Sequence, residues 1–483
     1  MIWLTVAAVM LAGVGIFFYY TMFRQAKSEL IEAIPTDATF IFALNDNEAF
    51  VRGSTQLTPC LNELFLLDAM PAYQTIRGKL PKGEYDLTVS GHTNNEAVSL
   101  LFNMHADKAA FKRLLRALSI DPNNYTSFEG NRIYTYGTNF KSMKFVFLNH
   151  VISFSTDMDL LKRAIVQHTH PKNLLSDKQF QEMYALTEKN QKQNWLLVNP
   201  NRYLSYFTTF LDEKLSQTLS NGLSHAGWTA FQLRFSGNEM FLSGYMFTDD
   251  PGHGFFELLE NRTGDGQGIL DLYPAQSHWY AHLETPQVKN LALLNGFSKE
   301  ERTLMKSLNP TEVGYFLISR DSVDYQYVVM SSDTNKEVLE VFYGDKADSA
   351  QTSTPDGIYS IPDHLAPLMK SLAPDSVGCF MQREGALVFA SSKEAMKVYQ
   401  NSMKALGSLS QNRYYPFVNE AVASSSVMNF VLFNNESDPY WMSQISEKGK
   451  VSHVGQQLRI LSLSCETMEK GKNLVPVNLF MLF

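Results

Sequence analysis

The sequence is low in charged residues and has few cysteines, whereas nucleic-acid-binding proteins and disulfide-rich proteins are rich in one or the other. Charged residues make up 19% of the 483 residues, and the net charge is −8 at pH 7. Nucleic acid is bound by concentrated basic surfaces, so we expect no nucleic acid partner. The three cysteines, Cys60, Cys379 and Cys465, lie far apart and form neither a C-x-x-C pair nor a disulfide framework. We expect them to be small buried apolar residues, and their spacing leaves open whether any pair is oxidised.

Sequence motifs of known mechanism are missing as well. The chain has no nucleophile elbow, P-loop, dinucleotide-binding glycine loop, zincin histidine pair or EF-hand loop. His168 and His170 have the spacing of half a metal site, but no second pair of ligands accompanies them, and zinc takes four. Asp265 lies among three glycines, yet one carboxylate is too few for a hard cation. The sequence therefore predicts no catalytic residue, no metal and no cofactor.

One long apolar run is present, at the start of the chain. Residues 2–23 contain no charged residue, and as a helix rising about 1.5 Å per residue they would span roughly 33 Å. Aromatic residues stand near both ends of the run, and Arg24 ends it. A cleaved signal peptide would need a basic start and a small-x-small cleavage site, and the segment has neither. We therefore predict an uncleaved transmembrane anchor over residues 1–27, with residues 2–23 in the lipid bilayer.

The rest of the chain has the pattern of two copies of one module. Five landmarks recur in the same order, at separations of 225 to 239 residues. The matched segments are 34–40 with 273–279, 130–134 with 356–359, 152–156 with 387–391, 195–199 with 430–434, and 232–234 with 457–459. Glycine and aspartate are dense over 251–268, which is typical of a linker. The sequence thus predicts a first module at 28–250, a linker at 251–268 and a second module, an internal repeat, at 269–483.

Within each copy, expected strands follow one another across short turns, which favours hairpins and antiparallel sheet. The stretches 143–148 and 151–155 form one such pair. Apolar residues recur at helical spacing over 107–118, and Asp107 and Asp157 are placed to cap the helices that follow them. The predicted fold class is α+β: an N-terminal transmembrane helix, then two related modules of mainly antiparallel sheet with helices packed on one face. The closing stretch, 475–483, is expected to be the last strand of its module.

The apolar span, the segment IPTDATFIFAL at 34–44 and the strand-rich remainder with its second partial copy together resemble a known family. This is a family of single-pass, membrane-anchored bacterial envelope proteins defined only as a domain of unknown function. The resemblance covers most of the chain after residue 28. It implies the cytoplasmic (inner) membrane, with the bulk of the chain in the periplasm, whereas Arg24 and Lys27 by the positive-inside rule favour the cytoplasm. It supplies no catalytic or binding residue.

A cluster of aromatic residues, Tyr206, Phe207 and Phe210, is a candidate lining for an apolar ligand groove, with core packing as the alternative. We accordingly expect a non-enzymatic, membrane-anchored envelope protein that binds or scaffolds an envelope protein, a lipid or another apolar ligand. Two alternatives stay open. One is a membrane-tethered hydrolase or transferase without a recognisable motif, and the other is a structural spacer.

Overall fold

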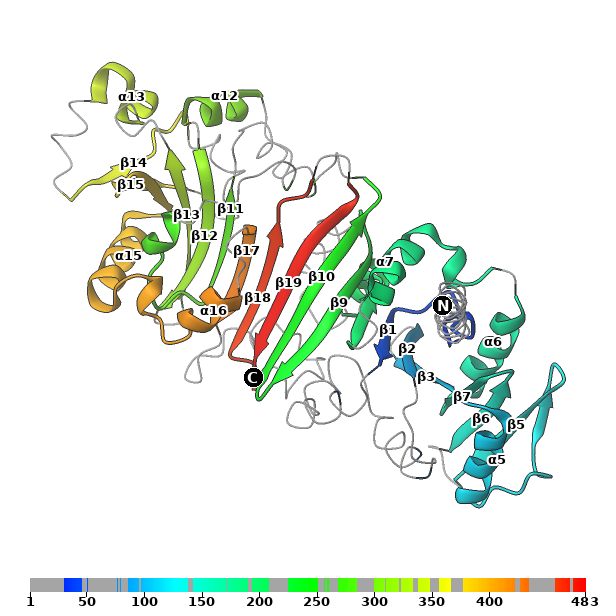
Figure 1. Ribbon diagram of the computed structural model, residues 1–483. Helices are drawn as coiled ribbons and strands as arrows, with labels where there is room; N and C mark the ends of the chain where they lie inside the picture. Colours follow the sequence, from blue (N-terminus) through cyan, green and yellow to red (C-terminus); the bar gives the residue numbers. More distant parts are fainter. Residues whose placement is uncertain are drawn as a thin grey trace, which may run out of the picture. The chain divides into compact units, whose positions relative to one another are not determined.

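The protein is described by a computed structural model that covers much of the chain after residue 29 (Figure 1). The described residues are 30–45, 86–94, 97–137, 142–170, 172–189, 193–207, 225–250, 268–284, 299–308, 310–320, 323–332, 338–347, 356–365, 377–421, 426–433, 457–469 and 472–483, with the single residues 50, 76, 79, 256 and 259. The predicted anchor, 1–27, and the predicted linker residues 251–255, 257, 258 and 260–267 lie outside them. Within the described residues, no helix combines the length and the apolar character needed to cross a bilayer.

The chain divides into two compact units. Unit 1 is Met1–Ser220, Gly227–Gly237 and Lys448–His453, and unit 2 is Asn221–Ala226, Asn238–Glu447 and Val454–Phe483. The module boundaries at 28–250 and 269–483 stay a prediction.

Unit 1 is built mainly from short antiparallel strands. Its strands are β1 (Phe40–Leu44), β2 (Leu87–Asn94), β3 (Ala97–His105), β4 (Thr126–Phe128), β5 (Asn131–Tyr136), β6 (Met143–Leu148), β7 (Val151–Ser155), β8 (Trp195–Val198) and β9 (Ala226–Ser236). Its helices are α5 (Lys108–Ala117), α6 (Met158–Thr169), α7 (Lys178–Lys189) and α8 (Pro200–Phe207), with a 3₁₀ turn η1 (Leu174–Ser176). Hydrogen-bonded neighbours follow the order β4-β5-β6-β7-β3-β2-β1-β8-β9.

Helices cover both faces of the unit 1 strands. Successive side chains on a strand point to opposite faces, so Phe145 and Val146 of β6 face opposite ways. Phe111 of α5 lies 5.8 Å from the ring of Tyr134, the cross-strand partner of Phe145. Leu161 of α6 instead packs in the cluster that contains Val146. Helices α5 and α6 therefore lie on opposite faces.

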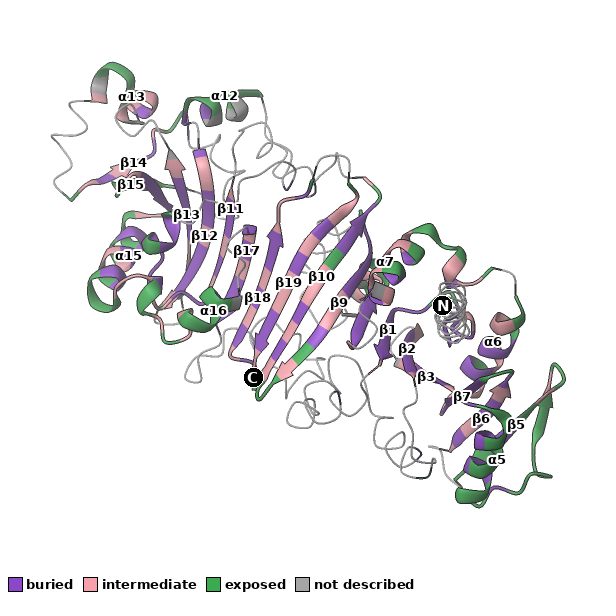
Figure 2. Cartoon of the chain, in the orientation of Figure 1, coloured by how far each residue is buried: buried purple, intermediate pink, exposed green. Residues whose placement is uncertain are grey.

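Local signals fixed these helices at the residues expected. The Asp107 carboxylate accepts a hydrogen bond from the Ala110 amide at 2.6 Å, and the Asp157 carboxylate accepts from the Leu160 amide at 3.1 Å. Each bond satisfies an amide that the first helical turn leaves without a partner, so both predicted N-caps are confirmed. Figure 2 shows the buried stripe and the exposed stripe of α6 side by side.

Unit 2 repeats this type of construction. Its strands are β10 (Glu239–Thr248), β11 (Trp279–Glu284), β12 (Pro310–Arg320), β13 (Val323–Ser332), β14 (Ile358–Ser360), β15 (Cys379–Arg383), β16 (Ala386–Ala390), β17 (Ser426–Phe433), β18 (Ile460–Glu466) and β19 (Leu474–Leu482). Its helices are α12 (Lys299–Leu308), α13 (Val338–Tyr343), α15 (Lys393–Leu406) and α16 (Tyr415–Ala421), with 3₁₀ turns η3 (Gly268–Leu272), η4 (Gly344–Lys346) and η6 (Leu409–Gln411). The hydrogen-bonded order is β14-β15-β16-β13-β12-β11-β17-β18-β19-β10.

Unit 2 also carries helices on both faces of its strands. The ring of Phe342 in α13 lies 4.6 Å from that of Phe380 and 6.3 Å from that of Phe389. Residue Val388, next to Phe389 on β16, faces the other way and packs in the cluster that contains Met396 of α15. The described cysteines of this unit, Cys379 and Cys465, are buried free thiols, while Cys60 lies outside the described residues.

The predicted fold class, α+β with two sheet modules and helices on one face, is wrong. Every pairing among the 19 described strands is antiparallel, and the sheet of each unit carries short helices on both faces rather than on one. Strand β10, expected to close the first module, pairs over nine residues with β19, the last strand of the chain (Figure 1). A closing strand presents a row of unpaired backbone groups, and a second such edge can satisfy them.

The covering of both faces has an equally simple cause. Strands β1, β7 and β16 are buried at every residue, so both of their faces are covered; β1 and β16 are apolar throughout, whereas β7 buries Ser153 and Ser155 on one face. In the sequence alone, a short apolar run such as 40–44 fits a buried strand or a buried helix segment equally well, so it does not predict that both faces of a sheet are covered.

Candidate functional site

The chemistry-bearing side chains of unit 1 gather where the chain enters β1. The segment after Ile34 turns at Pro35, where the Ala38 amide donates to the Pro35 carbonyl at 3.1 Å. The Thr39 amide then donates to the Gly91 carbonyl at 2.8 Å and starts the pairing of β1 with β2. This turn places Asp37 beside β2, although the two segments are some fifty residues apart in sequence.

A buried histidine on β2 receives Asp37. The His92 imidazole is 1% exposed; its Nδ1 lies 3.1 Å from Asp37 Oδ1, and its Nε2 lies 3.0 Å from Ser90 Oγ. An ionised carboxylate only accepts hydrogen bonds, so Nδ1 carries the proton and Nε2 accepts from the Ser90 hydroxyl. The carboxylate is half exposed, and its other oxygen accepts from the Arg163 guanidinium of α6.

Both titratable groups are shifted downward. Burial, which alone would raise the pKa of Asp37, is outweighed by the hydrogen bonds and charges of His92 and Arg163, and this pKa lies well below its usual range. Burial lowers the pKa of His92, the nearby Arg163 and Arg202 lower it further, and Asp37 offsets part of the effect. At neutral pH the site therefore holds a carboxylate, a guanidinium and a neutral imidazole.

The hydrogen-bonded series Ser90–His92–Asp37 has the atom order of a catalytic triad, but its hydroxyl group is buried and inaccessible to a substrate. A nucleophile must approach a substrate carbon closely, and Ser90 is fully buried. The hydroxyl, the imidazole and the carboxylate instead satisfy one another inside the sheet, which removes the cost of burying each alone. This arrangement fixes the turn at Asp37 against β2.

The exposed face of the same turn borders an open hollow of about 680 Å³. Three of its lining residues are cations, Lys162, Arg163 and Lys172, and three are apolar. The full lining is Pro35, Thr36, Asp37, Phe128, Lys162, Arg163, Val166, Gln167, His170 and Lys172. The Lys162 ammonium lies 5.7 Å from the centre of the Phe128 ring, and the Val166 side chain is 47% exposed. The hollow thus joins positive charge to exposed apolar surface.

The far side of the hollow is formed by the chain that leaves α6. The Gln167 side-chain amide donates to the Lys172 carbonyl at 2.7 Å, and the Lys172 amide donates to His170 Nδ1 at 3.1 Å. Both bonds hold the turn that presents Lys172 to the hollow.

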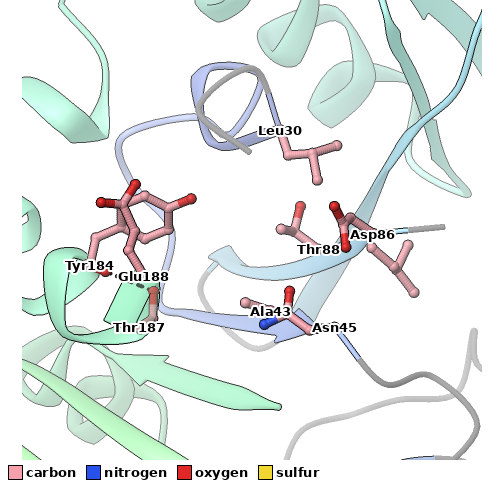
Figure 3. A pocket seen from close by; sticks show the side chains of 9 residues that line it. Leu30, Ala43, Asn45, Asp86, Thr88, Tyr184, Thr187 and Glu188 are labelled. Carbon is pink, nitrogen blue, oxygen red and sulfur yellow. Dashed lines mark hydrogen bonds between the residues drawn. The ribbon is translucent and has the colours of Figure 1, made fainter. Parts of the chain in front are cut away.

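A second cavity of unit 1, between β1, β2 and α7, is much smaller. Figure 3 shows Tyr184, Thr187 and Glu188 of α7 on one side and Thr88 of β2 on the other. Its volume is about 20 Å³, which is room for about one water. The buried Thr88 hydroxyl has no hydrogen-bond partner among the described residues and is the group that such a water would satisfy. We therefore place no larger ligand here.

The residues singled out from the sequence fall in different places. His168 lies in the last turn of α6 and His170 caps its end, and among the described residues no three metal-ligating side chains cluster. The side chains of Tyr206 and Phe207 on α8, and all of Phe210, lie outside what the structure describes, as does Asp265. Sequence reasoning missed the pairing of Asp37 with His92, because no motif links residues 55 positions apart.

Comparisons with known proteins are sparse. No protein-family model matches the chain, and no curated protein matches it. Solved structures of one protein, TP0453, match at low TM-scores. Its crystal form I has a TM-score of 0.26 and 11% identity over 46% of this chain and 79% of that one. Its crystal form III has a TM-score of 0.20 and 8% identity over 77% and 97%. A likeness at this level says nothing of function.

Acidification should destabilise unit 1 through His92. Its pKa in the folded state lies below the value of about 6.5 in the unfolded chain, so between these two pKa values the unfolded state binds the proton and the folded state does not. At pH 7.5 His92 is neutral in both states and does not reduce the free energy of unfolding. Below pH 6.5 this free energy falls by up to about 1.4 kcal/mol per pH unit. Asp37 contributes only at lower pH, because its stabilisation is lost as pH falls below about 4.

The measurement is amide exchange of β2 between pH 7.5 and 5.5, corrected for intrinsic rates. His92→Gln should have a lower free energy of unfolding at pH 7.5 than the unsubstituted protein. Its free energy of unfolding should also fall less steeply with decreasing pH, by the slope that one titrating group contributes. An unchanged slope in the variant would show that another group carries it.

Proposed function

We propose that the chain is a non-enzymatic protein of the cell envelope that binds its partner at the hollow of unit 1. The observation that carries this proposal is the contrast at the Asp37 turn. The Ser90 hydroxyl and the His92 imidazole are buried, whereas the hollow presents three cations and the half-exposed Asp37 carboxylate beside apolar side chains, a lining suited to binding a ligand.

The predicted anchor gives this binding surface its setting. Pro35 follows Phe23, the last residue of the apolar run, by 12 positions. An extended chain advances about 3.5 Å per residue, so this connection keeps the hollow within roughly 40 Å of the bilayer. We propose the cytoplasmic membrane as the location and the periplasm as the side, with a lipid or an envelope protein as partner. Tethering raises the local concentration of either.

Two experiments on the full chain test this function. Membranes carrying the protein are washed with alkaline carbonate, and we expect the protein to stay in the pellet; release into the supernatant would contradict the anchor. Purified protein is then assayed against a generic 4-nitrophenyl ester next to its Ser90→Ala variant. We expect equal, background-level hydrolysis, whereas turnover that depends on Ser90 would establish the hydrolase alternative.

A further inference from the structure

The turn that borders the hollow has a close counterpart in unit 2. The Ser277 amide donates to the Pro274 carbonyl at 3.0 Å, just as Ala38 donates to Pro35. The His278 amide donates to the Leu317 carbonyl at 2.9 Å, as Thr39 donates to Gly91 in unit 1. These bonds make Asp37 and Gln276 equivalent positions.

The helix beside the turn also has a counterpart. Asp157 caps α6 through the Leu160 amide, and Ser392 caps α15 through the Ala395 amide at 3.2 Å. Both helices are followed by a 3₁₀ turn, η1 or η6, that begins with a buried leucine. Residue 163 of α6 therefore corresponds to residue 398 of α15, and residue 172 to residue 407.

In unit 2 the chain leaving the helix is closed onto the turn. The Ala275 amide donates to the Gly407 carbonyl at 3.1 Å, and the Leu409 amide donates to the Tyr273 carbonyl at 2.6 Å. The Asn412 side chain adds a bond of 2.6 Å to the Ala275 carbonyl. Between the equivalent described segments of unit 1, 34–36 and 172–177, no such backbone bond is made. The turn and the chain leaving the helix are therefore hydrogen-bonded to each other in unit 2, whereas in unit 1 the hollow lies open between them.

The charges differ in the same sense. Gln276 replaces the carboxylate and bonds to the Ser402 hydroxyl of α15. Of the three cations around the unit 1 hollow, Lys162 keeps a lysine counterpart, Lys397, while Arg163 and Lys172 correspond to Val398 and Gly407. Open space and excess positive charge therefore occur together at one of two otherwise alike turns.

We propose that the unit 1 hollow binds the phosphate headgroup of an anionic phospholipid. The claim rests on the proposed function, which holds unit 1 beside a bilayer. Lys162 and Lys172 contact the phosphate oxygens, and Val166 and Phe128 contact the first apolar groups below the headgroup. Arg163 is a positioning residue, since its guanidinium is engaged by Asp37, which is fixed in turn by His92.

Charge and apolar surface together select a lipid rather than a soluble anion. An ion such as inorganic phosphate would use the cations alone and leave the exposed Val166 side chain in water. The Lys162 ammonium forms an ion pair with the Asp159 carboxylate at 3.5 Å. This carboxylate is 89% exposed, and an exposed ion pair of this kind holds its lysine weakly. The ammonium can therefore turn to a phosphate.

The test uses the full chain in nonionic detergent micelles containing either phosphatidylglycerol or phosphatidylcholine. The readout is amide exchange of residues 162–172. We expect protection with phosphatidylglycerol only, and an apparent affinity at least about 30-fold lower in the double variant Lys162→Glu/Lys172→Glu, at about fivefold for each lysine charge that is lost. The matched control is Lys397→Glu, an exposed lysine at the equivalent position of the closed site.

Each other outcome would overturn the proposal in a distinct way. Equal protection by phosphatidylcholine would remove the role of charge, and equal protection by soluble glycerol 3-phosphate would assign the hollow to a free phosphate. Equal loss in Lys397→Glu would place the effect on overall charge. Release of the protein by the carbonate wash would contradict the predicted anchor, but it would not contradict protection of residues 162–172 by phosphatidylglycerol.

Discussion

Phe154→Ala and Phe389→Ala should each cost about 3–5 kcal/mol of stability, the usual range for removing a buried phenylalanine from a packed core. Both side chains are fully buried. The Phe154 ring lies 4.9 Å from that of Phe102 and 5.5 Å from that of Phe145, in a row that crosses three strands. The two substitutions should cost alike because Phe389 occupies the same place in unit 2, beside Phe380 of the preceding strand at 6.0 Å.

Because the chain has two compact units, one global melting curve is not expected to be two-state. Amide exchange should instead be followed in β6 and β7 for Phe154→Ala and in β15 and β16 for Phe389→Ala. Tyr136→Ala, at a side chain 37% exposed on β5, is the control and should cost under about 1 kcal/mol. A large loss for one phenylalanine and a small loss for the other would show that the two rows are not equivalent.

The sequence was most informative about local structure. The stretches 143–148 and 151–155 are β6 and β7, joined by a tight turn in which Asn149 adopts a positive φ of 55°. Asparagine tolerates that conformation, and the alternating and apolar runs on either side indicate strands. Hairpins and N-caps depend on residues within one turn of each other, so they can be predicted without knowledge of the rest of the chain.

Long-range pairing could not be predicted in the same way. The sequence match of 195–199 with 430–434 makes Leu197 equivalent to Leu432. The strand pairing in the structure makes Leu197 equivalent to Val431 instead. Leu197 pairs with Ile41, and Val431 pairs with Tyr280, the equivalent of Ile41. A shift of one residue moves every side chain to the other face of the sheet, so only the pairing partners fix it. The pairing of β10 with β19 is of the same kind.

The site was beyond sequence reasoning for a related reason. Asp37, His92 and Arg163 belong to a turn, a strand and a helix that meet only in the folded unit. Each residue type is common, and none lies in a motif. The available signal was indirect: 34–40 and 273–279 match in sequence, yet Asp37 is replaced by Gln276, which singles out that position as one where the two copies differ.

Two alike turns, one open and one closed, are the centre of this account, and amide exchange of the ligand-free full chain measures them directly. The amides of Ala275 and Leu409 are hydrogen-bonded across the closed turn, and those of the equivalent Thr36 and Leu174 have no such bond within the described part of unit 1. We expect Ala275 and Leu409 to exchange at least about 1,000-fold more slowly than their intrinsic rates, and Thr36 to exchange within about tenfold of its own. Equal protection of Thr36 and Ala275 would contradict the account, because it would show that the unit 1 turn is closed as well.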